Sequence, residues 1–195
     1  MTKKEIDRIL GFGSSHIMAL PGSPVGVSKF QAFLAIKPVL KGKFYWYALR
    51  QAYDLSDNLF LYRTDVKLAF CSDDPFREFL MNCSERKVWA KLPPRVTIYR
   101  GMTAKELEGK IYGVSWTLSR QKAEYFARQY PRNYAVNHLE KVVHKKVVSK
   151  NKIVAFFNER LEEEIIYIDK HPLKGRRSVK FEPADQYEML NPGLD

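Results

Sequence analysis

Cysteine is scarce in this chain, and its scarcity excludes two kinds of protein. Cys71 and Cys83 are the only cysteines among 195 residues. Two cysteines are too few for the disulfide framework of a small secreted domain, and by themselves they do not make a zinc site. Cys83 shares an expected helical face with Phe76, Phe79 and Leu80, so we expect it to be a buried free thiol.

Other absences reduce the number of cellular compartments and cofactors that we expect for this protein. Residues 1–5 lack the apolar run of a signal peptide, and no apolar stretch approaches the ~18 residues of a membrane span. We therefore expect a cytoplasmic protein without a membrane partner. His138 and His144 lack the spacing of a metal site, so we expect no metal. The glycine-rich run 11–15 is not followed by Gly-Lys-Ser/Thr, which argues against a phosphate loop of that kind.

Acidic residues are also in deficit. The chain has 33 Lys and Arg but only 22 Asp and Glu, which gives a formal net charge of +11. Such a charge favours an acidic partner such as nucleic acid, although a basic protein without such a partner is as common. A hydrophobic content of 45% with 13% aromatic residues is typical of a folded globular protein.

Residues 1–92 are predicted to form a mostly helical lobe. A short helix is expected over 3–10, before the first glycine. Asp74 is expected to cap a second helix, because a proline follows it at the first helical position. Another short helix is expected over 84–91, where a pair of prolines ends it.

Residues 44–62 are rich in aromatic side chains, and two interpretations stay open. The aromatic residues are Phe44, Tyr45, Trp46, Tyr47, Tyr53, Phe60 and Tyr62. With Lys43 and Arg50 among them, they resemble a surface that stacks single-stranded bases. Their helical spacing favours the alternative, which is the core of the helical lobe.

After residue 93 the pattern changes to strands around one helix, which predicts an α+β fold. The stretches typical of strands are 96–99, 110–116, 142–148, 153–157 and 165–168. Serine at the N-cap and apolar residues at helical spacing predict a helix over 119–130. We expect a core over 93–182 and a tail over 183–195, with the helical lobe and the core in one compact unit.

Two short polar signals lie on these strands. Arg100 ends one strand and precedes Gly101, so its guanidinium lies where the backbone can turn and can clamp a phosphate. Ser115 and Thr117 are two residues apart on another strand, so their hydroxyls share a face and can bond a ribose or a carboxylate. Taken alone, the same residues are typical of a surface ion pair and a half-buried strand.

A third signal is the run of Glu162, Glu163 and Glu164 that leads into an apolar strand. In an extended segment the first and third of these carboxylates share a face, and the second points away. Carboxylates that enter an apolar strand are costly to bury unless cations or hydroxyls partner them. A solvated acidic loop is the alternative, but the presence of Arg100 and Ser115 favours a site.

Together these signals resemble the arginine–serine–glutamate class of ADP-ribosyltransferases, which includes bacterial and phage-related toxins. Residues 89–101 resemble the approach to that family's arginine strand, and 113–119 with 123–127 resemble its serine strand and following helix. Residues 152–166 resemble its turn and catalytic strand. The chain has Trp-Thr where the commonest pattern has Thr-Ser. The resemblance implies a split core of mixed or antiparallel strands and transfer of ADP-ribose from NAD.

The resemblance also implies which residues bind NAD. Arg100 would hold its phosphate or ribose, and Gly101 would offer backbone groups to the nicotinamide amide. In the segment 129–138, Tyr130 and Tyr134 are candidates to stack on the nicotinamide ring and Arg132 is a candidate to meet a phosphate, with a solvated loop as the alternative. Phe126 would pack in the core or form one wall of the nicotinamide pocket.

Four further residues would carry the reaction. Glu164 would hold the ribose 2′-hydroxyl and stabilise the positive charge that develops as nicotinamide leaves. Ser115, with Thr117 behind it, would orient that glutamate and the nicotinamide ribose. Glu162 would face the acceptor and help to deprotonate it.

The acceptor stays ambiguous. Glu162, rather than glutamine, resembles family members that modify arginine on proteins. Two basic segments without any acid, 141–152 and 170–180, flank the glutamates in sequence and favour a nucleic acid, RNA in particular. We therefore expect nucleic acid ahead of protein arginine. An NAD glycohydrolase and a non-catalytic nucleic-acid-binding module are the remaining interpretations, and a toxin would also need an inhibitory partner protein.

Overall fold

Helices come first in the chain and strands follow. The computed structural model describes residues 1–11, 28–56, 59–110, 112–129 and 139–169. The described part of 1–92 contains helices and no strand. The helices are α1 (Lys3–Ile9), α2 (Lys29–Ile36), α3 (Lys43–Asp54), α4 (Arg63–Phe70) and α5 (Cys83–Lys91), with the short 3-10 turns η1 (Lys37–Val39), η2 (Leu59–Tyr62) and η3 (Arg77–Leu80).

Local capping explains where several of these helices begin. The Ser28 side chain accepts from the backbone N–H of Gln31, whose own side chain accepts from Ser28 N–H, so α2 starts with a complete capping box. Asn82 and Glu85 form the same arrangement at the start of α5. The helix expected over 84–91 is thus present and begins at Cys83, one residue early.

The helix expected after Asp74 is wrong. The Asp74 carboxylate accepts from the backbone N–H of Gly42 at 3.0 Å, so a contact with the start of α3 takes the place of a cap. Phe76 adopts a left-handed conformation, φ 67°, and only the turn η3 follows it. Phe76 and Phe79 are therefore exposed, and Cys83 is an exposed thiol and not a buried one.

Five antiparallel strands form one sheet in the order β3-β1-β2-β5-β4, so the α+β prediction is confirmed. The strands are β1 (Arg95–Thr103), β2 (Ser115–Thr117), β3 (Lys141–Ser149), β4 (Ile153–Phe157) and β5 (Glu164–Tyr167). One residue pair, Tyr99 opposite Thr117, joins β1 to β2. Thr117 in turn lies opposite Glu164, which lies opposite Phe157.

The strand expected over 110–116 is the main difference from the sequence prediction in this half. Thr103 ends β1 and begins α6 (Ala104–Gly109) through a capping box with Glu106. Lys110 then adopts φ 53°, and the strand starts only at Ser115. The helix expected over 119–130 is α7 (Arg120–Arg128), with Ser119 as its N-cap.

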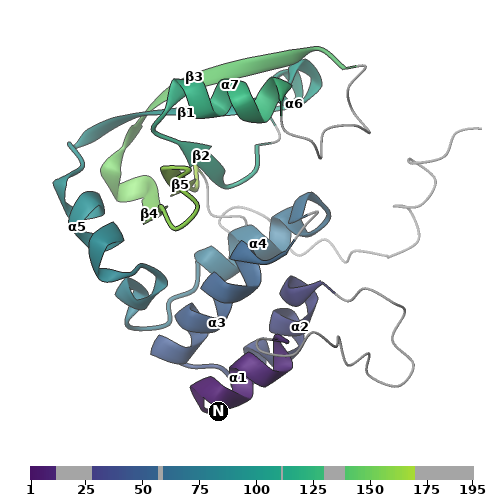
Figure 1. Cartoon of the computed structure of the whole chain (residues 1–195), viewed down its shortest axis with the longest axis vertical. Helices are drawn as coiled ribbons and strands as arrows, with labels where there is room; N and C mark the ends of the chain where they lie inside the picture. The colour runs from purple at the N-terminus through teal and green to yellow at the C-terminus, as the bar shows by residue number, and fades with distance from the viewer. Residues whose placement is uncertain (12–27, 57–58, 111, 130–138, 170–195) are drawn as a thin grey trace, which may run out of the picture.

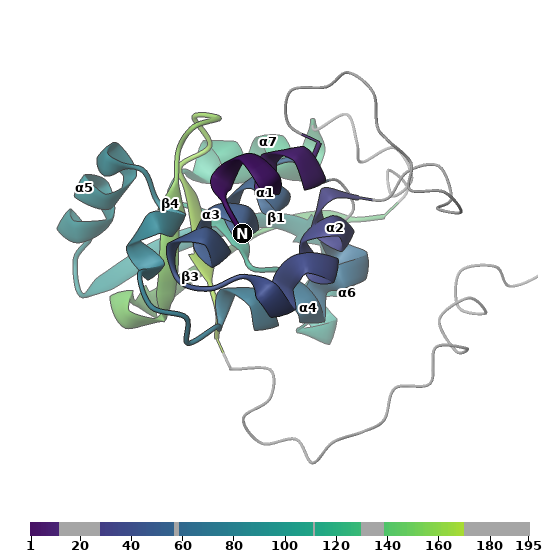
Figure 2. The ribbon, with the colours of Figure 1, turned by 90° about the horizontal axis from the view of Figure 1, so that it is seen from below.

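The helices α1 to α4 lie together below the strands, whereas α6 and α7 lie beside the paired strands β1 and β3 (Figure 1). The view from below shows α1 to α4 in front of the sheet (Figure 2). Aromatic rings fill the interior of this layer: Tyr45, Trp46 and Tyr53 are all buried. These three side chains belong to the core, which supports the second interpretation of the aromatic-rich segment.

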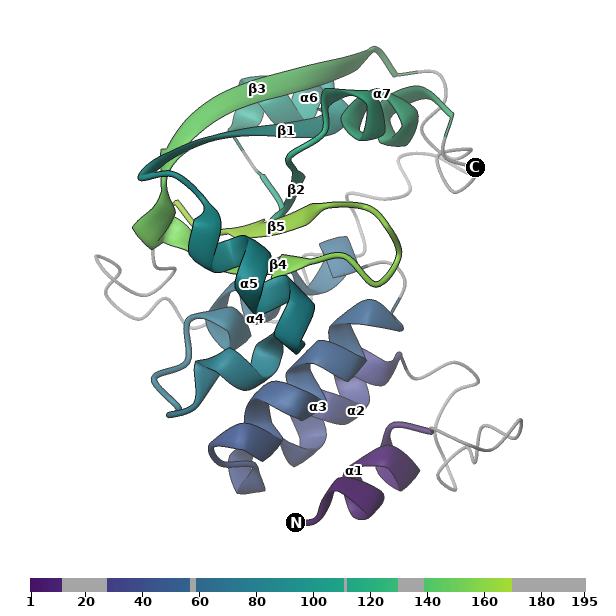
Figure 3. The ribbon, with the colours of Figure 1, turned by 60° about the vertical axis from the view of Figure 1, so that its left-hand side comes forward.

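Helix α7 packs closely on β1 because of one glycine (Figure 3). A Cβ at Gly101 would lie 2.2 Å from the carbonyl oxygen of Ala123 and 2.6 Å from the backbone nitrogen of Ala127. Neither atom belongs to a flexible side chain, so no larger residue fits there. Gly101 therefore has a packing role.

Candidate active site

Glu164 is the centre of the candidate site. It is the first residue of β5 and is 5% exposed. Its carboxylate accepts a hydrogen bond from the Tyr53 hydroxyl at 2.7 Å. Burial raises the pKa of Glu164, and hydrogen bonding from the Ser115 and Tyr53 hydroxyls works in the opposite direction. A buried carboxylate with two hydroxyl donors can hold a sugar hydroxyl or stabilise a nearby positive charge.

Tyr53 is a site residue that the sequence did not identify. It comes from α3, 111 positions before Glu164 in the chain. Burial, then the charge of Glu164, raises its pKa well above the usual value of a tyrosine, so Tyr53 remains a donor at neutral pH. Its only sequence signal is a place among many aromatic residues, and that signal points to the core.

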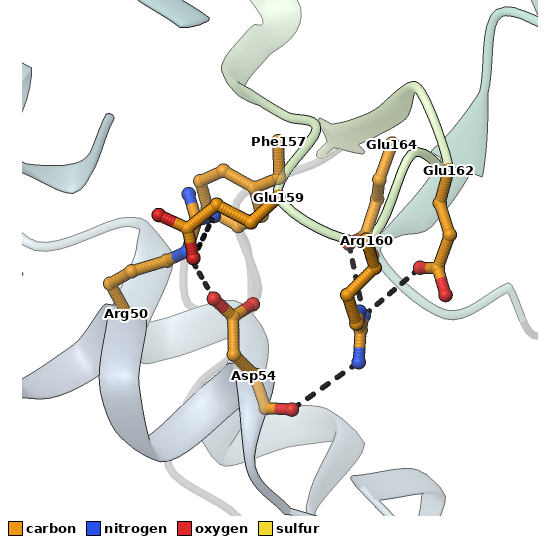
Figure 4. Close-up of a pocket in the computed structure, with 7 residues that line it drawn as sticks. All are labelled: Arg50, Asp54, Phe157, Glu159, Arg160, Glu162 and Glu164. Carbon is orange, nitrogen blue, oxygen red and sulfur yellow. Dashed lines mark hydrogen bonds and ion pairs between the residues drawn. The ribbon is translucent and has the colours of Figure 1, made fainter. Parts of the chain in front are cut away.

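Glu162 lies close to Glu164, and both carboxylates contact the guanidinium of Arg160. Nη2 of Arg160 is 3.0 Å from Glu162 Oε2 and 3.6 Å from Glu164 Oε2 (Figure 4). Nη1 of Arg160 donates to the backbone carbonyl of Asp54 at 3.3 Å. The two glutamates therefore face one space, as the sequence predicts, and a guanidinium lies between them. From the sequence, Arg160 is expected only as part of the loop 157–161 that would touch the target, and not as a partner of the glutamates.

A tight turn, and not strand alternation, gives the glutamates these directions. Leu161 and Glu163 have φ values of 57° and 49°, in the left-handed region, within the turn that joins the antiparallel strands β4 and β5. The Asn158 side chain accepts from the backbone N–H of Glu163 at 3.1 Å, and the Thr117 hydroxyl donates to the carbonyl of Glu162 at 2.8 Å. Glu163 itself pairs with a lysine of α7. Thr117 thus fixes the turn, and its hydroxyl bonds backbone and not a carboxylate.

Arg100 contacts the same group of residues through Ser115. Its Nη1 donates to the carbonyl oxygen of Ser115 at 2.7 Å, and its Nη2 is 3.5 Å from Glu106. Its Nε is buried and has no hydrogen-bond partner among the described residues. Gly113 makes room for the guanidinium, because a Cβ there would be 3.0 Å from Nη2. Arg100, Ser115 and Glu164 are therefore linked by direct contacts.

No protein-family model, curated protein or solved structure matches this chain. The residues and their geometry are therefore the basis for any function assigned to this chain. Across the described ranges, no group of three or more His, Cys, Asp or Glu side chains is arranged to hold a metal ion. No helix in those ranges is both long and apolar enough to cross a membrane.

The remaining expected binding residues are less informative. Gly101 packs against α7, as described above. Phe126 is half-buried on α7, where its ring meets the ring of Tyr125 edge-on at 5.6 Å. Tyr130 and the segment that follows it, to residue 138, lie outside the described residues.

The space between the glutamates is small as the side chains stand. A cavity of about 10 Å³, the size of one water molecule, is lined by residues of α3 and of the β4–β5 turn. Its lining residues are Arg50, Asp54, Phe157, Glu159, Arg160, Glu162 and Glu164. The Arg160 side chain is 51% exposed, and a rotation of its single bonds would enlarge this space.

Most of the first basic segment has structural partners. Lys146 and Lys152 each lie 3.3 Å from a carboxylate oxygen of Asp169. Lys150 donates to the backbone carbonyl of Ala90 at 2.7 Å and lies over the ring of Trp89. Lys141 and Lys145 are the members of this segment without such a contact in the described structure. The second basic segment, 170–180, lies outside the described residues.

Arg50 is a third unexpected residue at the site, after Tyr53 and Arg160. It is 6% exposed, and its Nη2 lies 3.0 Å from the equally buried carboxylate of Glu85. Its guanidinium also pairs with Asp54 and stacks over the ring of Phe157, 3.6 Å from the ring centre. The Glu85 carboxylate in turn accepts from the backbone N–H of Asn158 at 2.7 Å. Arg50 therefore supports both residues that begin the β4–β5 turn.

Proposed function

We propose that this chain is an NAD-dependent mono-ADP-ribosyltransferase with an ADP-ribosyltransferase-like fold. One observation carries the proposal: Arg100, Ser115 and Glu164, on three adjacent strands, form one connected set with Glu162 at its edge. The residue types and their order agree with the resemblance seen in the sequence.

The residues of this set have separate tasks in the proposal. Arg100 holds a phosphate of NAD. Its buried Nε–H has no hydrogen-bond acceptor among the described residues, and its side chain is 21% exposed. NAD supplies a ribose carbon whose bond to nicotinamide is broken. Glu164 holds a hydroxyl of that ribose and stabilises the positive charge on it, while Ser115 and Tyr53 keep the carboxylate in place.

A guanidinium is the acceptor that the geometry supports best. Glu162 and Glu164 already hold the guanidinium of Arg160, so an arginine side chain of a target protein could take the same place. This proposal differs from the preference for RNA drawn from the sequence, because three lysines of the first basic segment are engaged in structural contacts. Nucleic acid stays as a second candidate on account of Lys141 and Lys145, which lie on the edge strand β3.

The test is incubation of the protein with labelled NAD and agmatine, a small guanidino amine. We expect nicotinamide release and labelled agmatine, and we expect Glu164→Gln to slow both by about 10²–10³-fold. A parallel reaction with cell extract, treated separately with nuclease and with protease, identifies the macromolecular acceptor. Label that nuclease removes would favour the nucleic-acid candidate. Nicotinamide release without any labelled acceptor would indicate a glycohydrolase, and no NAD consumption with any acceptor would exclude the proposed activity.

A further inference from the structure

Arg160 occupies the space between the two candidate catalytic glutamates, and this placement has a chemical consequence. We propose that Arg160 is an internal acceptor, which the site of the same molecule ADP-ribosylates in the presence of NAD. The inference rests on the proposed function, since it uses the same reaction and the same carboxylates.

The contacts of Arg160 distinguish it from other exposed arginines among the described residues. One guanidinium nitrogen, Nη2, lies 3.0 Å from Glu162 and 3.6 Å from Glu164, while Nη1 is held by the carbonyl of Asp54 (Figure 4). Arg120 offers the contrast. It is also exposed and also paired with one glutamate, Glu124, at 2.9 Å, but both residues belong to the outer surface of α7. Only the first arrangement combines an exposed guanidinium with both candidate catalytic carboxylates.

The step balances without any further reactant. The bond between the ribose C1′ and the nicotinamide nitrogen breaks, and its electron pair leaves with nicotinamide. A bond forms between C1′ and a guanidinium nitrogen of Arg160. The proton released from that nitrogen passes to Glu162, which is already at hydrogen-bond distance, and then to water.

The modification would also limit the enzyme. Arg160 lies on the turn just before β5, and an ADP-ribose group attached there would bring a pyrophosphate and a bulky nucleoside to the opening of the site. We therefore expect transfer to an external acceptor to slow as Arg160 becomes modified.

The test is mass spectrometry of the full chain after incubation with NAD, with peptide mapping of the turn. We expect one ADP-ribose per chain, at Arg160, in wild type and in the matched control Arg120→Lys, and none in Arg160→Lys or Glu164→Gln. The reaction should be intramolecular, so its half-time should not depend on protein concentration, and added Glu164→Gln protein should stay unlabelled. If agmatine is modified in the same tube while Arg160 stays unmodified, the inference is wrong and the proposed function stands. If neither is modified and NAD is not consumed, the proposed function fails as well.

A second readout needs no NAD. If the two glutamates form a guanidinium site that Arg160 fills, agmatine should bind to Arg160→Ala about two- to fivefold more tightly than to wild type, the range set by a partly exposed ion pair. Calorimetric titration measures this difference. Adding Glu162→Gln to Arg160→Ala should remove the gain. Equal affinity of all three proteins for agmatine would show that the carboxylate pair does not select a guanidinium.

Discussion

Replacement of Tyr53 by phenylalanine tests whether a charged hydrogen bond holds the buried carboxylate of Glu164. The variant keeps the ring and removes only the hydroxyl that donates to Glu164 at 2.7 Å. A hydrogen bond to an ionised acceptor contributes about 1.5–3 kcal/mol, and one to a neutral acceptor about 0.5–1.5 kcal/mol. The loss of stability should therefore be larger where Glu164 is ionised, by about 1–1.5 kcal/mol, which corresponds to a rise of about one unit in its pKa.

The sign of the pH dependence follows from the direction of the shift. Because burial raises the folded-state pKa of Glu164, the native protein binds that proton more tightly than the unfolded chain does. The contribution of Glu164 to stability is thus most favourable below its unfolded pKa of about 4.3 and falls as the pH rises through the folded pKa. Tyr53→Phe raises the folded pKa further, so its unfolding free energy should fall more than that of wild type as the pH rises from below the unfolded pKa of Glu164 through its raised folded pKa.

The assay is urea unfolding at several pH values, and the chain offers a matched control. Tyr45 is a buried tyrosine whose hydroxyl donates to the backbone carbonyl of Ala69 at 2.9 Å, an acceptor that does not titrate. Burial raises the pKa of Tyr45 to about 12, so it stays a donor over this range. Tyr45→Phe should cost about 0.5–1.5 kcal/mol at every pH. If the loss in Tyr53→Phe is equally constant, the reasoning about an ionised Glu164 is refuted.

Three further substitutions test the packing and the site. Gly101→Ala should lower the unfolding free energy by about 3 kcal/mol or more, measured by urea unfolding, because its Cβ meets the backbone of α7; a loss below about 1 kcal/mol would contradict that packing. Glu85→Gln should cost about 1.5–3 kcal/mol by the same measurement, since the buried Arg50 loses a charged partner; an unchanged protein would mean that the remaining partners of Arg50 suffice. Gly113→Ala should displace the flexible end of Arg100 and weaken NAD binding about 10–100-fold in a calorimetric titration, with stability within about 1 kcal/mol of wild type. Unchanged NAD affinity in this last variant would argue against Arg100 as the phosphate ligand.

Local signals were sufficient for much of the fold. Ser119 caps helix α7 as predicted, because a cap and an apolar face are properties of neighbouring residues. Strands β3, β4 and β5 lie within one residue of the stretches rich in β-branched residues. The helix predicted after Asp74 is absent for a tertiary reason. The Asp74 carboxylate accepts a hydrogen bond from the backbone of Gly42, 32 positions away, and no local sequence pattern predicts such a partner. Helix α6 was missed because the capping box of Thr103 directly follows strand-forming residues.

Some residues of the candidate site could be predicted from local sequence signals and others could not. Ser115 and Glu164 could be found because each begins its strand, and the structure brings both into one set with Arg100. The position expected for Arg100 at the end of a strand is wrong, because β1 continues past it to Thr103 and pairs with β3 over that length. Tyr53 could not be found, because its partner is 111 positions away and its own neighbourhood predicts a core aromatic. Arg160 was visible in the sequence, but only the left-handed residues of the turn direct its guanidinium back between the glutamates.

Helix α3 contacts both the start and the end of the β4–β5 turn. Tyr53 holds Glu164, where the turn ends, and Arg50, one helical turn earlier, stacks on Phe157, where it begins. Arg50 also orders Glu85, whose carboxylate holds the backbone of Asn158. Side chains of α3 thus fix the turn that presents the candidate catalytic glutamate. This helix lies outside the part of the sequence that resembles ADP-ribosyltransferases. Helix α3, together with Glu85 of α5, therefore fixes the geometry of the turn, and a change in the packing of α3 would reach Glu164 through its buried hydrogen bond with Tyr53.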